Sequence, residues 1–440
     1  MEEINSGDTA WVLISAALVM LMTPGLAMFY GGMVRVKSVL NMMMMCFLAL
    51  GLVSIIWVLY GYSLAFGPDS GGLIGNFDFV GMANTVGEVE GTIPTLAFVM
   101  FQMTFGIITC ALLAGAVADR IRTIAWIAVI VLWTTFVYIP LAHWTWGGGW
   151  IGSQLGALDF AGGTVVEINS GFSALALAIV VGQRIGWRRD PMRPHNLPLV
   201  LLGAGMLWFG WFGFNAGSAL SAGDLAATAM INTQVCTAAA ALAWVLVEKI
   251  RDGKPTTLGI ASGAISGAVA ITPSCGFVNP MGALLIGLAA GAICAWAVGW
   301  KYKLGYDDSL DVLGVHGIGG LVGMIGIGLV ATTAVNADGG NGLFAGGGFE
   351  LLNKQLIASF ATIAYVFIVT WLIAMVVDKV IGFRVDPDVE ISGIDLDQHA
   401  ESGYELTDTT SGAFAGVGQS GLSHYQQEHP DTPGAEEQQR

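Results

Sequence analysis

Charged residues are scarce in this chain. Only 11% of its 440 residues are Asp, Glu, Lys or Arg, against about 25% in an ordinary soluble domain. Hydrophobic residues make up 55%, which excludes a water-soluble enzyme, and no alternating ten-residue pattern supports an outer-membrane barrel. The apolar residues form uninterrupted runs of about twenty, the length that one helix needs to cross a bilayer. The sequence therefore predicts an all-α polytopic membrane protein.

Cysteine is also rare, and the chain starts without a basic segment. The residues from Met1 to Asp8 are acidic, so no cleavable signal is predicted. Because the five cysteines lie in apolar segments without metal-ligand spacing, we expect small buried side chains and no metal centre. They are Cys46, Cys110, Cys236, Cys275 and Cys294.

The formal net charge of -15 is concentrated at one end of the chain. From Asp386 to Arg440 there are twelve Asp or Glu residues and one basic residue, so this stretch carries -11 of the -15. The remainder is nearly balanced, and the charge gives no support to nucleic-acid binding. We therefore divide the chain into a membrane domain, 1–384, and an acidic cytoplasmic tail, 385–440, which we expect to be mostly disordered beyond about 407.

Glycine is abundant, with 62 residues, about twice the usual share of roughly 7%. It lies inside the apolar runs, which favours close contact between membrane helices. Hydropathy predicts eleven spans, each long enough to cross about 30 Å of hydrocarbon, although 256–274 only barely reaches. The predicted spans are 9–31, 38–66, 94–118, 123–143, 161–183, 196–216, 223–247, 256–274, 278–300, 311–333 and 353–381.

Basic residues orient these spans, because they concentrate in loops on the cytoplasmic side. With eleven spans, sixteen of the seventeen Lys and Arg residues fall on one side, and only Lys354 falls on the other. The N-terminus is therefore predicted outside and the C-terminus inside. The external loops are then 67–93, 144–160 and 334–352.

The first ten spans divide into two sets of five, 9–183 and 196–333, followed by the final span 353–381. An odd number of spans per set gives the halves opposite orientations, and inverted repeats place substrate sites at their interface. One sequence echo agrees with this division. Leu158-Asp159 opens the fifth span and Leu310-Asp311 opens the tenth, each followed by Gly and Val.

Two ionisable residues lie inside predicted spans, where each costs at least a few kcal/mol and calls for a partner. Glu167 lies in the fifth span and His316 in the tenth. In an inverted repeat the two side chains can meet, and a carboxylate touching an imidazole titrates as one unit that passes a proton near neutral pH. The alternative is that backbone groups or water satisfy each of them separately.

At these residues the sequence resembles the Amt branch of the Amt/Mep/Rh ammonium transporters, in a variant with Glu167 where most members carry the first of two pore histidines. The resemblance covers nearly all of residues 9–405. It rests on the segments 23–32 (TPGLAMFYGG), 60–67 (YGYSLAFG), 146–149 (WGGG), 159–164 (DFAGGT), 210–218 (GWFGFNAGS), 272–276 (TPSCG), and Asp307-Asp308 before 314–317 (GVHG).

The resemblance implies a homotrimer in the plasma (inner) membrane, each subunit holding its own pore between two inverted five-helix halves. It assigns substrate recruitment to Trp146 and Ser218 together with Phe105, and a stacked gate to Phe105 and Phe214. His316 matches the second pore histidine. The motifs within 382–404 imply docking between subunits and control by a PII-type regulatory protein.

Without the resemblance, these residues also have structural interpretations. Trp146 fits a membrane-interface aromatic, Ser218 fits a loop cap, and Phe105 and Phe214 fit core or lipid-facing aromatics. By the resemblance, Asp159 matches the family's buried acid below the recruitment site. We assign it an electrostatic and structural role, since a carboxylate bonded to backbone amides at the start of the fifth span is equally consistent.

The sequence thus predicts an ammonium transporter that recruits the ion outside, deprotonates it and conducts ammonia through an apolar pore. The proton would travel separately through Glu167 and His316, so that uptake moves charge. No cofactor or enzymatic activity is expected. The alternatives are an ammonium sensor, which usually carries a larger cytoplasmic domain, and an electroneutral gas channel, which the Trp146 and Ser218 pair disfavours.

Overall fold

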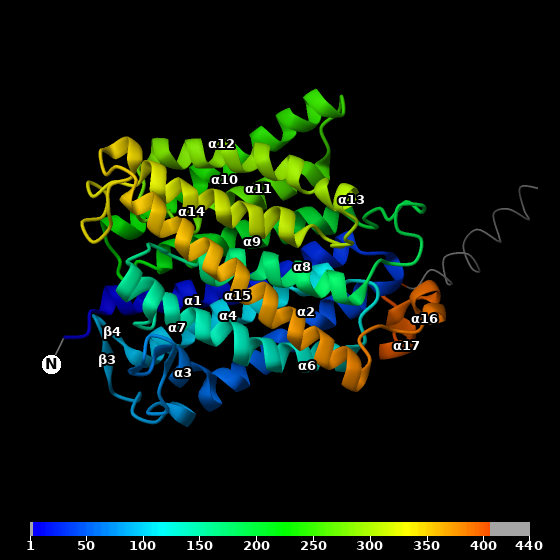
Figure 1. Ribbon diagram of the computed structural model, residues 1–440, viewed down its shortest axis with the longest axis horizontal. Helices are drawn as coiled ribbons and strands as arrows, with labels where there is room; N and C mark the ends of the chain where they lie inside the picture. Colours follow the sequence, from blue (N-terminus) through cyan, green and yellow to red (C-terminus); the bar gives the residue numbers. More distant parts are fainter. Residues whose placement is uncertain (1–2, 405–440) are drawn as a thin grey trace, which may run out of the picture.

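The computed structural model describes residues 3–404, and in this range the chain forms a bundle of long helices lying side by side (Figure 1). The N-terminal residues and two small β-hairpins lie at the left end of the bundle in this view. The short helices α13, Trp300–Leu304, α16, Pro387–Ser392, and α17, Ile394–His399, lie at the opposite end. The predicted stretch of disorder beyond 407 lies outside the described residues.

Ten helical stretches are long and apolar enough to cross a membrane, which confirms the prediction of a multi-pass helical protein. Several join two helices through a π-helical turn or a short break. The stretches are Ser6–Met33 (α1), Val36–Phe66 (α2, Val39–Ile56, and α3, Tyr62–Phe66), Thr95–Val117 (α4, Thr95–Leu112, and α5, Ala114–Val117), Thr123–Leu155 (α6, Thr123–Trp133, and α7, Ile139–Thr145), Gly163–Val181 (α8, Asn169–Val181), Leu197–Gly217 (α9), Asp224–Arg251 (α10), Pro280–Leu304 (α12, Pro280–Ala297, and α13), Leu313–Val330 (α14, Ile318–Val330) and Glu350–Ile381 (α15).

The remaining predicted span is shorter than hydropathy indicated. Helix α11, Thr257–Ile271, has 15 residues, and at about 1.5 Å per residue it is roughly 22 Å long, less than the hydrocarbon thickness. Most of its second half is buried, and it packs against α9, α10, α12 and α14. Its apolar run therefore reflects burial in protein as well as contact with lipid.

The connections at the left end carry the only strands within residues 3–404. Strand β1, Asp69–Ser70, pairs antiparallel with β2, Ile74–Gly75, and β3, Val89–Glu90, pairs with β4, Ile93–Pro94. The predicted 144–160 loop differs from expectation, because it contains a further helical turn, Trp150–Leu155. At the other end, the Asp395 carboxylate of α17 accepts hydrogen bonds from the N–H groups of Leu40 and Asn41, and so caps α2.

Helices α1 and α9 cross through reciprocal glycine contacts. A Cβ atom on Gly203 would stand 2.3 Å from the backbone nitrogen of Phe29, and one on Gly25 would stand 3.4 Å from the backbone nitrogen of Leu207. A single shift of 178 residues relates the two contacts: position 25 corresponds to position 203, and position 29 corresponds to position 207. Such an exchange indicates a local two-fold relation between antiparallel helices.

A second pair of helices shows the same relation. Gly171 of α8 approaches the backbone of Gly317, with a Cβ-to-nitrogen distance of 2.2 Å, and Gly320 of α14 approaches the backbone nitrogen of Ile168, at 3.1 Å. Adding 149 to 171 and 168 gives 320 and 317. The reciprocal contacts bring the beginnings of these two helical stretches together inside the bundle, where Glu167 and His316 are located.

Candidate functional site

Glu167 and His316 are in direct contact. His316 Nδ1 lies 2.7 Å from Glu167 Oε2, and the two residues are 3% and 1% exposed, His316 first. Each side chain comes from a π-helical turn at the start of its stretch, Gly163–Ile168 for the acid and Leu313–Gly317 for the histidine. The structure therefore favours a joined pair over two separately satisfied groups. Both stretches begin inside the bundle, which explains why polar side chains so near a helix start are buried.

Asp159 holds the beginning of the Glu167 turn. Its carboxylate accepts hydrogen bonds from the N–H groups of Gly162, Gly163 and Thr164 at 2.6–2.8 Å, and from the Thr164 hydroxyl at 2.5 Å. These groups have no intrahelical acceptor at a helix start, so a carboxylate there satisfies several donors at once. Asp159 thus fixes the backbone that carries Glu167.

Asp308 holds the His316 turn in the corresponding way, a role that the sequence analysis did not assign to it. Its carboxylate accepts a hydrogen bond from the Leu313 N–H at 2.8 Å, and the residue is 1% exposed. The separation from Asp308 to His316 is eight residues, the same as from Asp159 to Glu167. That repeated acid-to-ionisable spacing is the signal that would have revealed Asp308.

The sequence echo between Leu158-Asp159 and Leu310-Asp311 is therefore out of register. The shift of 149 residues that relates the glycine contacts pairs Asp159 with Asp308, and pairs Gly162 with Asp311. The last two residues share a positive φ, 125° and 63°, which marks the same bend before each helix start. The echo aligned identical residue types, whereas the feature that the two halves repeat is an acid that caps a buried helix start.

Burial affects both capping acids. It raises the pKa of Asp308 to about 6, because the charged form loses its hydration and because Asp311 lies nearby. Burial also raises the pKa of Asp159, although the hydrogen bonds from Thr164 and the backbone favour its charged form.

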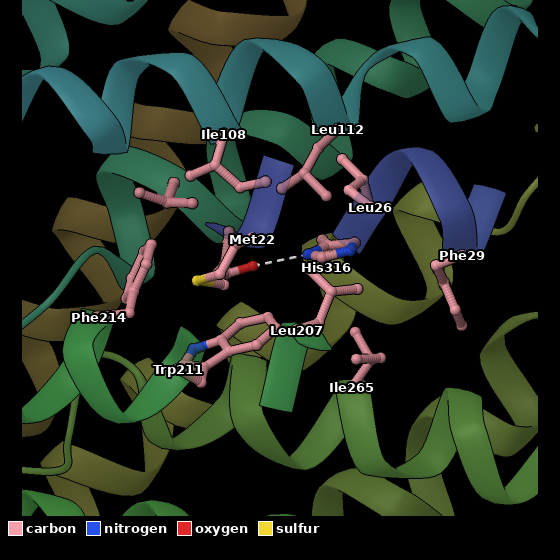
Figure 2. Close-up of a pocket in the computed structure, with 12 residues that line it drawn as sticks. Met22, Leu26, Phe29, Ile108, Leu112, Leu207, Trp211, Phe214, Ile265 and His316 are labelled. Atoms are coloured by element: carbon pink, nitrogen blue, oxygen red, sulfur yellow. Dashed lines mark hydrogen bonds and ion pairs between the residues drawn. The ribbon is translucent and has the colours of Figure 1, made fainter. Parts of the chain in front are cut away.

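The Glu167 and His316 pair lies in a narrow, nearly closed cavity, the lumen, whose volume of about 10 Å³ is close to what one water molecule needs. Figure 2 shows Phe214 at one end of the labelled side chains and Phe29 at the other, with His316 and its dashed contact between them. Glu167 Oε1 is buried without a hydrogen-bond partner in the described structure. Apart from the pair the lining is apolar or aromatic, from Met22, Leu26, Phe29, Ile108, Leu112, Val166, Leu207, Trp211, Phe214 and Ile265.

Three aromatic rings connect this lumen to a groove at the hairpin end. The Phe105 and Phe214 rings lie 4.1 Å apart between centroids and are inclined by 32°, and Trp146 meets Phe105 edge to face at 5.9 Å. Phe214 lines the lumen, whereas Trp146 lines the groove with Asp69 and Glu88. The structure therefore brings Trp146, Phe105 and Phe214 together in a row that ends at the pair.

Hydrogen bonds at two of the predicted recruitment residues orient their side chains. Trp146 Nε1 donates to the Asp159 carbonyl at 2.9 Å, which ties the indole to the start of the Glu167 stretch. Ser218 Oγ donates to the Phe214 carbonyl at 2.8 Å and so caps the end of α9. A hydroxyl that donates in this way keeps its lone pairs for accepting an N–H bond.

The titratable chemistry of the lumen is proton exchange. Within residues 3–404 no three His, Cys, Asp or Glu side chains converge on one point. The five cysteines are buried, which confirms the predicted burial of these side chains. The arrangement is an apolar conduit with one titratable pair.

Comparison with known proteins identifies the family of this chain. The Ammonium Transporter Family matches residues 10–404. The chain belongs to that family. This ammonium transporter family member is 52% identical over 433 residues to an ammonium transporter of Mycobacterium tuberculosis, with 91% of each chain covered. It is 50% identical over 406 residues to one of Bacillus subtilis, with 91% of this chain and 99% of the relative covered.

Solved structures agree with this assignment. Candida albicans Mep2 superposes with a TM-score of 0.83 and 34% identity over 92% of this chain and 94% of its own. A structure described as a sensor Amt protein gives 0.83 and 28% identity over 89% and 98%. The family member is thus a multi-pass protein of the plasma membrane and a transporter, not an enzyme, as the sequence predicted.

Proposed function

We propose that this protein takes up ammonium by separating it into ammonia and a proton. Ammonium loses its proton beside the aromatic row, ammonia crosses the lumen, and the proton passes through Glu167 and His316 so that uptake moves positive charge. The observation that carries the proposal is the 2.7 Å contact between the two titratable side chains in an otherwise apolar lumen.

The apolar lining explains why deprotonation is required. A bare ammonium ion in such a lumen would meet the large cost of removing a charge from water. Ammonia is neutral and avoids most of this cost. The proton instead moves between groups that hydrogen-bond each other, and a coupled carboxylate and imidazole accept and release it near neutral pH.

Recruitment at the outer end selects ammonium over potassium. The two ions have similar size and charge, so a site discriminates by directional hydrogen bonds. We assign a face-on cation–π contact to Trp146 with Phe105, worth about 0.5–2 kcal/mol, and an accepted N–H bond to Ser218. Phe105 and Phe214 form the gate. Asp159 acts by orienting the Glu167 turn and by favouring a cation nearby.

The wider architecture follows the family resemblance. We propose eleven spans, with α11 as the eighth, an external N-terminus, a cytoplasmic C-terminus and two inverted five-helix halves. The reciprocal contacts of α1 with α9 and of α8 with α14 support the inversion. We also propose a homotrimer with a pore in each subunit, and a PII-type regulator that acts at the end with α16 and α17.

The deciding experiment is electrophysiology of the purified protein in liposomes. Ammonium pulses are expected to give inward current, and equal potassium pulses none above protein-free liposomes. Uptake of ammonia without current would contradict the proton route and favour an electroneutral gas channel. Ammonium binding without uptake would favour a sensor, the alternative raised by the fold shared with the sensor Amt protein.

Changing Glu167 to His is expected to shift the pH dependence of uptake. The ordinary pKa values of a carboxyl group and an imidazole in water lie about two pH units apart, so the proton occupancy of the pair changes at a given pH. The measurement is initial uptake rate between pH 5 and 8 for the natural protein and Glu167→His. Superimposable profiles would exclude a titrating role for Glu167.

A further inference from the structure

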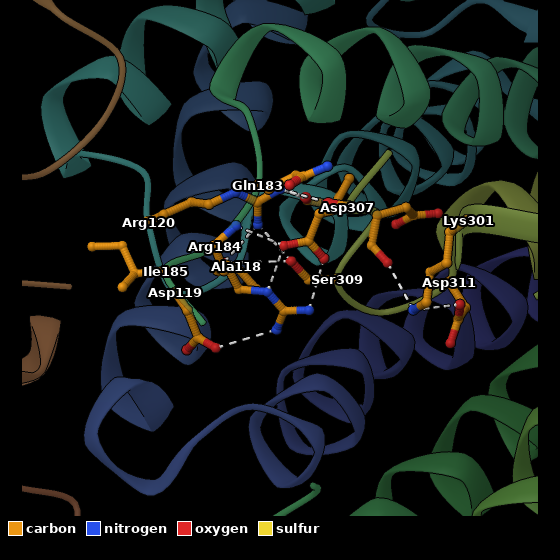
Figure 3. A network of polar contacts seen from close by, with 12 residues as sticks. Ala118, Asp119, Arg120, Gln183, Arg184, Ile185, Lys301, Asp307, Ser309 and Asp311 are labelled. Atoms are coloured by element: carbon orange, nitrogen blue, oxygen red, sulfur yellow. Dashed lines mark hydrogen bonds and ion pairs between the residues drawn. The ribbon is translucent and has the colours of Figure 1, made fainter. Parts of the chain in front are cut away.

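The ammonium group of Lys301 is buried beside the start of the helical stretch that carries His316 (Figure 3). Its Nζ lies 2.7 Å from Asp311 Oδ1 and donates a hydrogen bond to the Asp308 carbonyl oxygen at 3.0 Å. The same nitrogen lies 5.6 Å from the centroid of the Tyr302 ring. A carboxylate, a carbonyl oxygen and an aromatic face are groups that together bind an alkylammonium ion. The chain thus holds one of its own ammonium groups in a cation site.

This site is related to the surroundings of Trp146 by the two-fold relation between the halves. The shift of 149 residues pairs Asp159 with Asp308, and it also pairs their neighbours Gly162 and Asp311. Trp146 contacts the first member of each pair, because its Nε1 donates to the Asp159 carbonyl at 2.9 Å and its ring lies 3.5 Å from the Cβ position of Gly162. The buried ammonium group contacts the second member of each pair. An indole at the hairpin end and an ammonium group at the α13 end therefore contact equivalent positions.

The two side chains affect an incoming cation in opposite ways. The indole of Trp146 offers a π face, which attracts a cation. Lys301 instead fills its site with a covalently attached cation, so a free ammonium ion finds the hydrogen-bond acceptors already used. The pocket beside Lys301 does not decide the matter by its net charge, because its lining carries both signs, from Arg184, Arg188, Arg189, Asp190 and Asp311.

A separate network holds the backbone of the site (Figure 3). Arg184 forms an ion pair with the Asp307 carboxylate at 2.9 Å. Arg120 donates to the Asp307 carbonyl at 2.6 Å and to the Ser309 hydroxyl at 2.5 Å. These two acceptor residues flank Asp308 in the chain, so its carbonyl oxygen keeps its direction without help from the ammonium group. We therefore expect the site to persist when the lysine side chain is shortened.

The site stands where the lumen leads toward the α13 end. Phe29 of α1 lines the lumen, and Met33, one turn further along the same helix, lines the pocket that Lys301 and Asp311 also line. We propose that Lys301 fills an alkylammonium site at the inner end of the lumen and thereby makes ammonium transport directional. The directional role rests on the proposed function. The site itself does not, and it is measured separately.

The site is tested by returning the missing group to a shortened side chain. Lys301→Ala removes three carbons and the nitrogen, which together make propylammonium. At high concentration, propylammonium chloride is expected to raise the thermal transition of this variant in detergent by about 2 °C more than that of the natural protein, because it binds only the folded state. Potassium chloride at equal ionic strength supplies no N–H donors and should give no such difference. Equal shifts for the variant and the natural protein, or an equal effect of potassium, would overturn the site.

A second variant keeps the stem of the side chain and tests ammonium itself. Lys301→Met ends one atom short of the lysine nitrogen, so the vacant position has the size of an ammonium ion. Ammonium chloride should raise the transition of this variant more than that of the natural protein, since binding near Trp146 contributes equally to both. Lys303→Met is the matched control, because Lys303 lies on the same helix and is exposed. A response of Lys301→Met no larger than that of the control would overturn the site.

Directional transport is measured in liposomes that hold the protein in one orientation, sorted by an affinity tag at the C-terminus. Ammonium is applied at equal concentration either to the hairpin end or to the α13 end. The natural protein is expected to carry about fivefold more current from the hairpin end, and Lys301→Met nearly equal currents, because ammonium binds the vacated site. Lys301→Arg retains a cation and should keep the natural ratio, as should Lys303→Met.

The outcomes separate the directional role from the proposed function. A current ratio in Lys301→Met equal to that of the natural protein would overturn the directional role. Absence of current from either end in every protein would contradict the proposed function, while the thermal shifts would still measure the site alone.

Discussion

Replacing His316 with Ala is expected to reduce ammonium-driven current in liposomes by at least tenfold. The substitution removes the imidazole that contacts Glu167 Oε2 at 2.7 Å and leaves a carboxyl group alone in an apolar lumen. Burying an isolated carboxylate costs free energy, so the group takes up a proton and stays neutral. It then no longer exchanges that proton. The same loss is expected for Glu167→Gln, which keeps the shape of the side chain and removes its titration.

The control for these variants is Leu207→Met, which changes the lumen wall at similar volume without a titratable group. It should conduct close to the natural rate, within about twofold. Current that is unchanged in both His316→Ala and Glu167→Gln would exclude the pair as the proton route. Correct folding of each variant is checked by its elution and thermal transition in detergent.

Changing Gly203 to Val is expected to cost about 3 kcal/mol in stability and to lower the thermal transition by roughly 5 °C. A Cβ atom there would stand 2.3 Å from the Phe29 nitrogen and 2.7 Å from the Gly25 oxygen. Both are backbone atoms, so the helices α1 and α9 must separate. Their crossing is the most extensive helix contact in the described structure.

Gly205→Val provides the matched control for this prediction. The position lies on the same helix and is exposed, and a Cβ atom would meet nothing within 4 Å. The substitution makes the same change in helix propensity but no collision, and it should change stability by about 0.5 kcal/mol or less. Equal transitions for the two variants would mean that close approach of α1 and α9 contributes little to the fold.

Hydropathy predicted most helices, because lipid demands long apolar segments with internally satisfied backbones. Ten of eleven predicted spans correspond to helices of full length. It made the span at α11 four residues too long, since the buried half of that helix is apolar as well, and it placed 144–160 in a loop although Trp150–Leu155 is helical. Hydropathy measures transfer into lipid, and it does not distinguish lipid from the interior of a helix bundle.

The candidate site was predictable where an ionisable side chain interrupts an apolar run. The cost of burying Glu167 and His316 led to the prediction that they meet, and the structure shows the contact. Asp308 was noted only as part of a family motif and was given no role, because it lies just outside a predicted span, where an acid is ordinary. Its role depends on where the chain bends and which N–H groups it caps, and neither follows from hydropathy. The assignments of Trp146 and Ser218 to recruitment depend on the family resemblance and stay predictions.

The two capped helix starts also determine the electrostatic field that a permeating molecule meets. A helix start carries roughly half a positive charge, and two of them approach the lumen from opposite sides. Asp159 and Asp308 cancel these partial charges while they are ionised. Because the pKa of Asp308 is raised to about 6, acidification of the side with α13 leaves about half a positive charge uncancelled there. If ammonia is the permeating species, as proposed, we expect acidification of that side to raise the barrier to a cation and to leave the barrier to neutral ammonia unchanged.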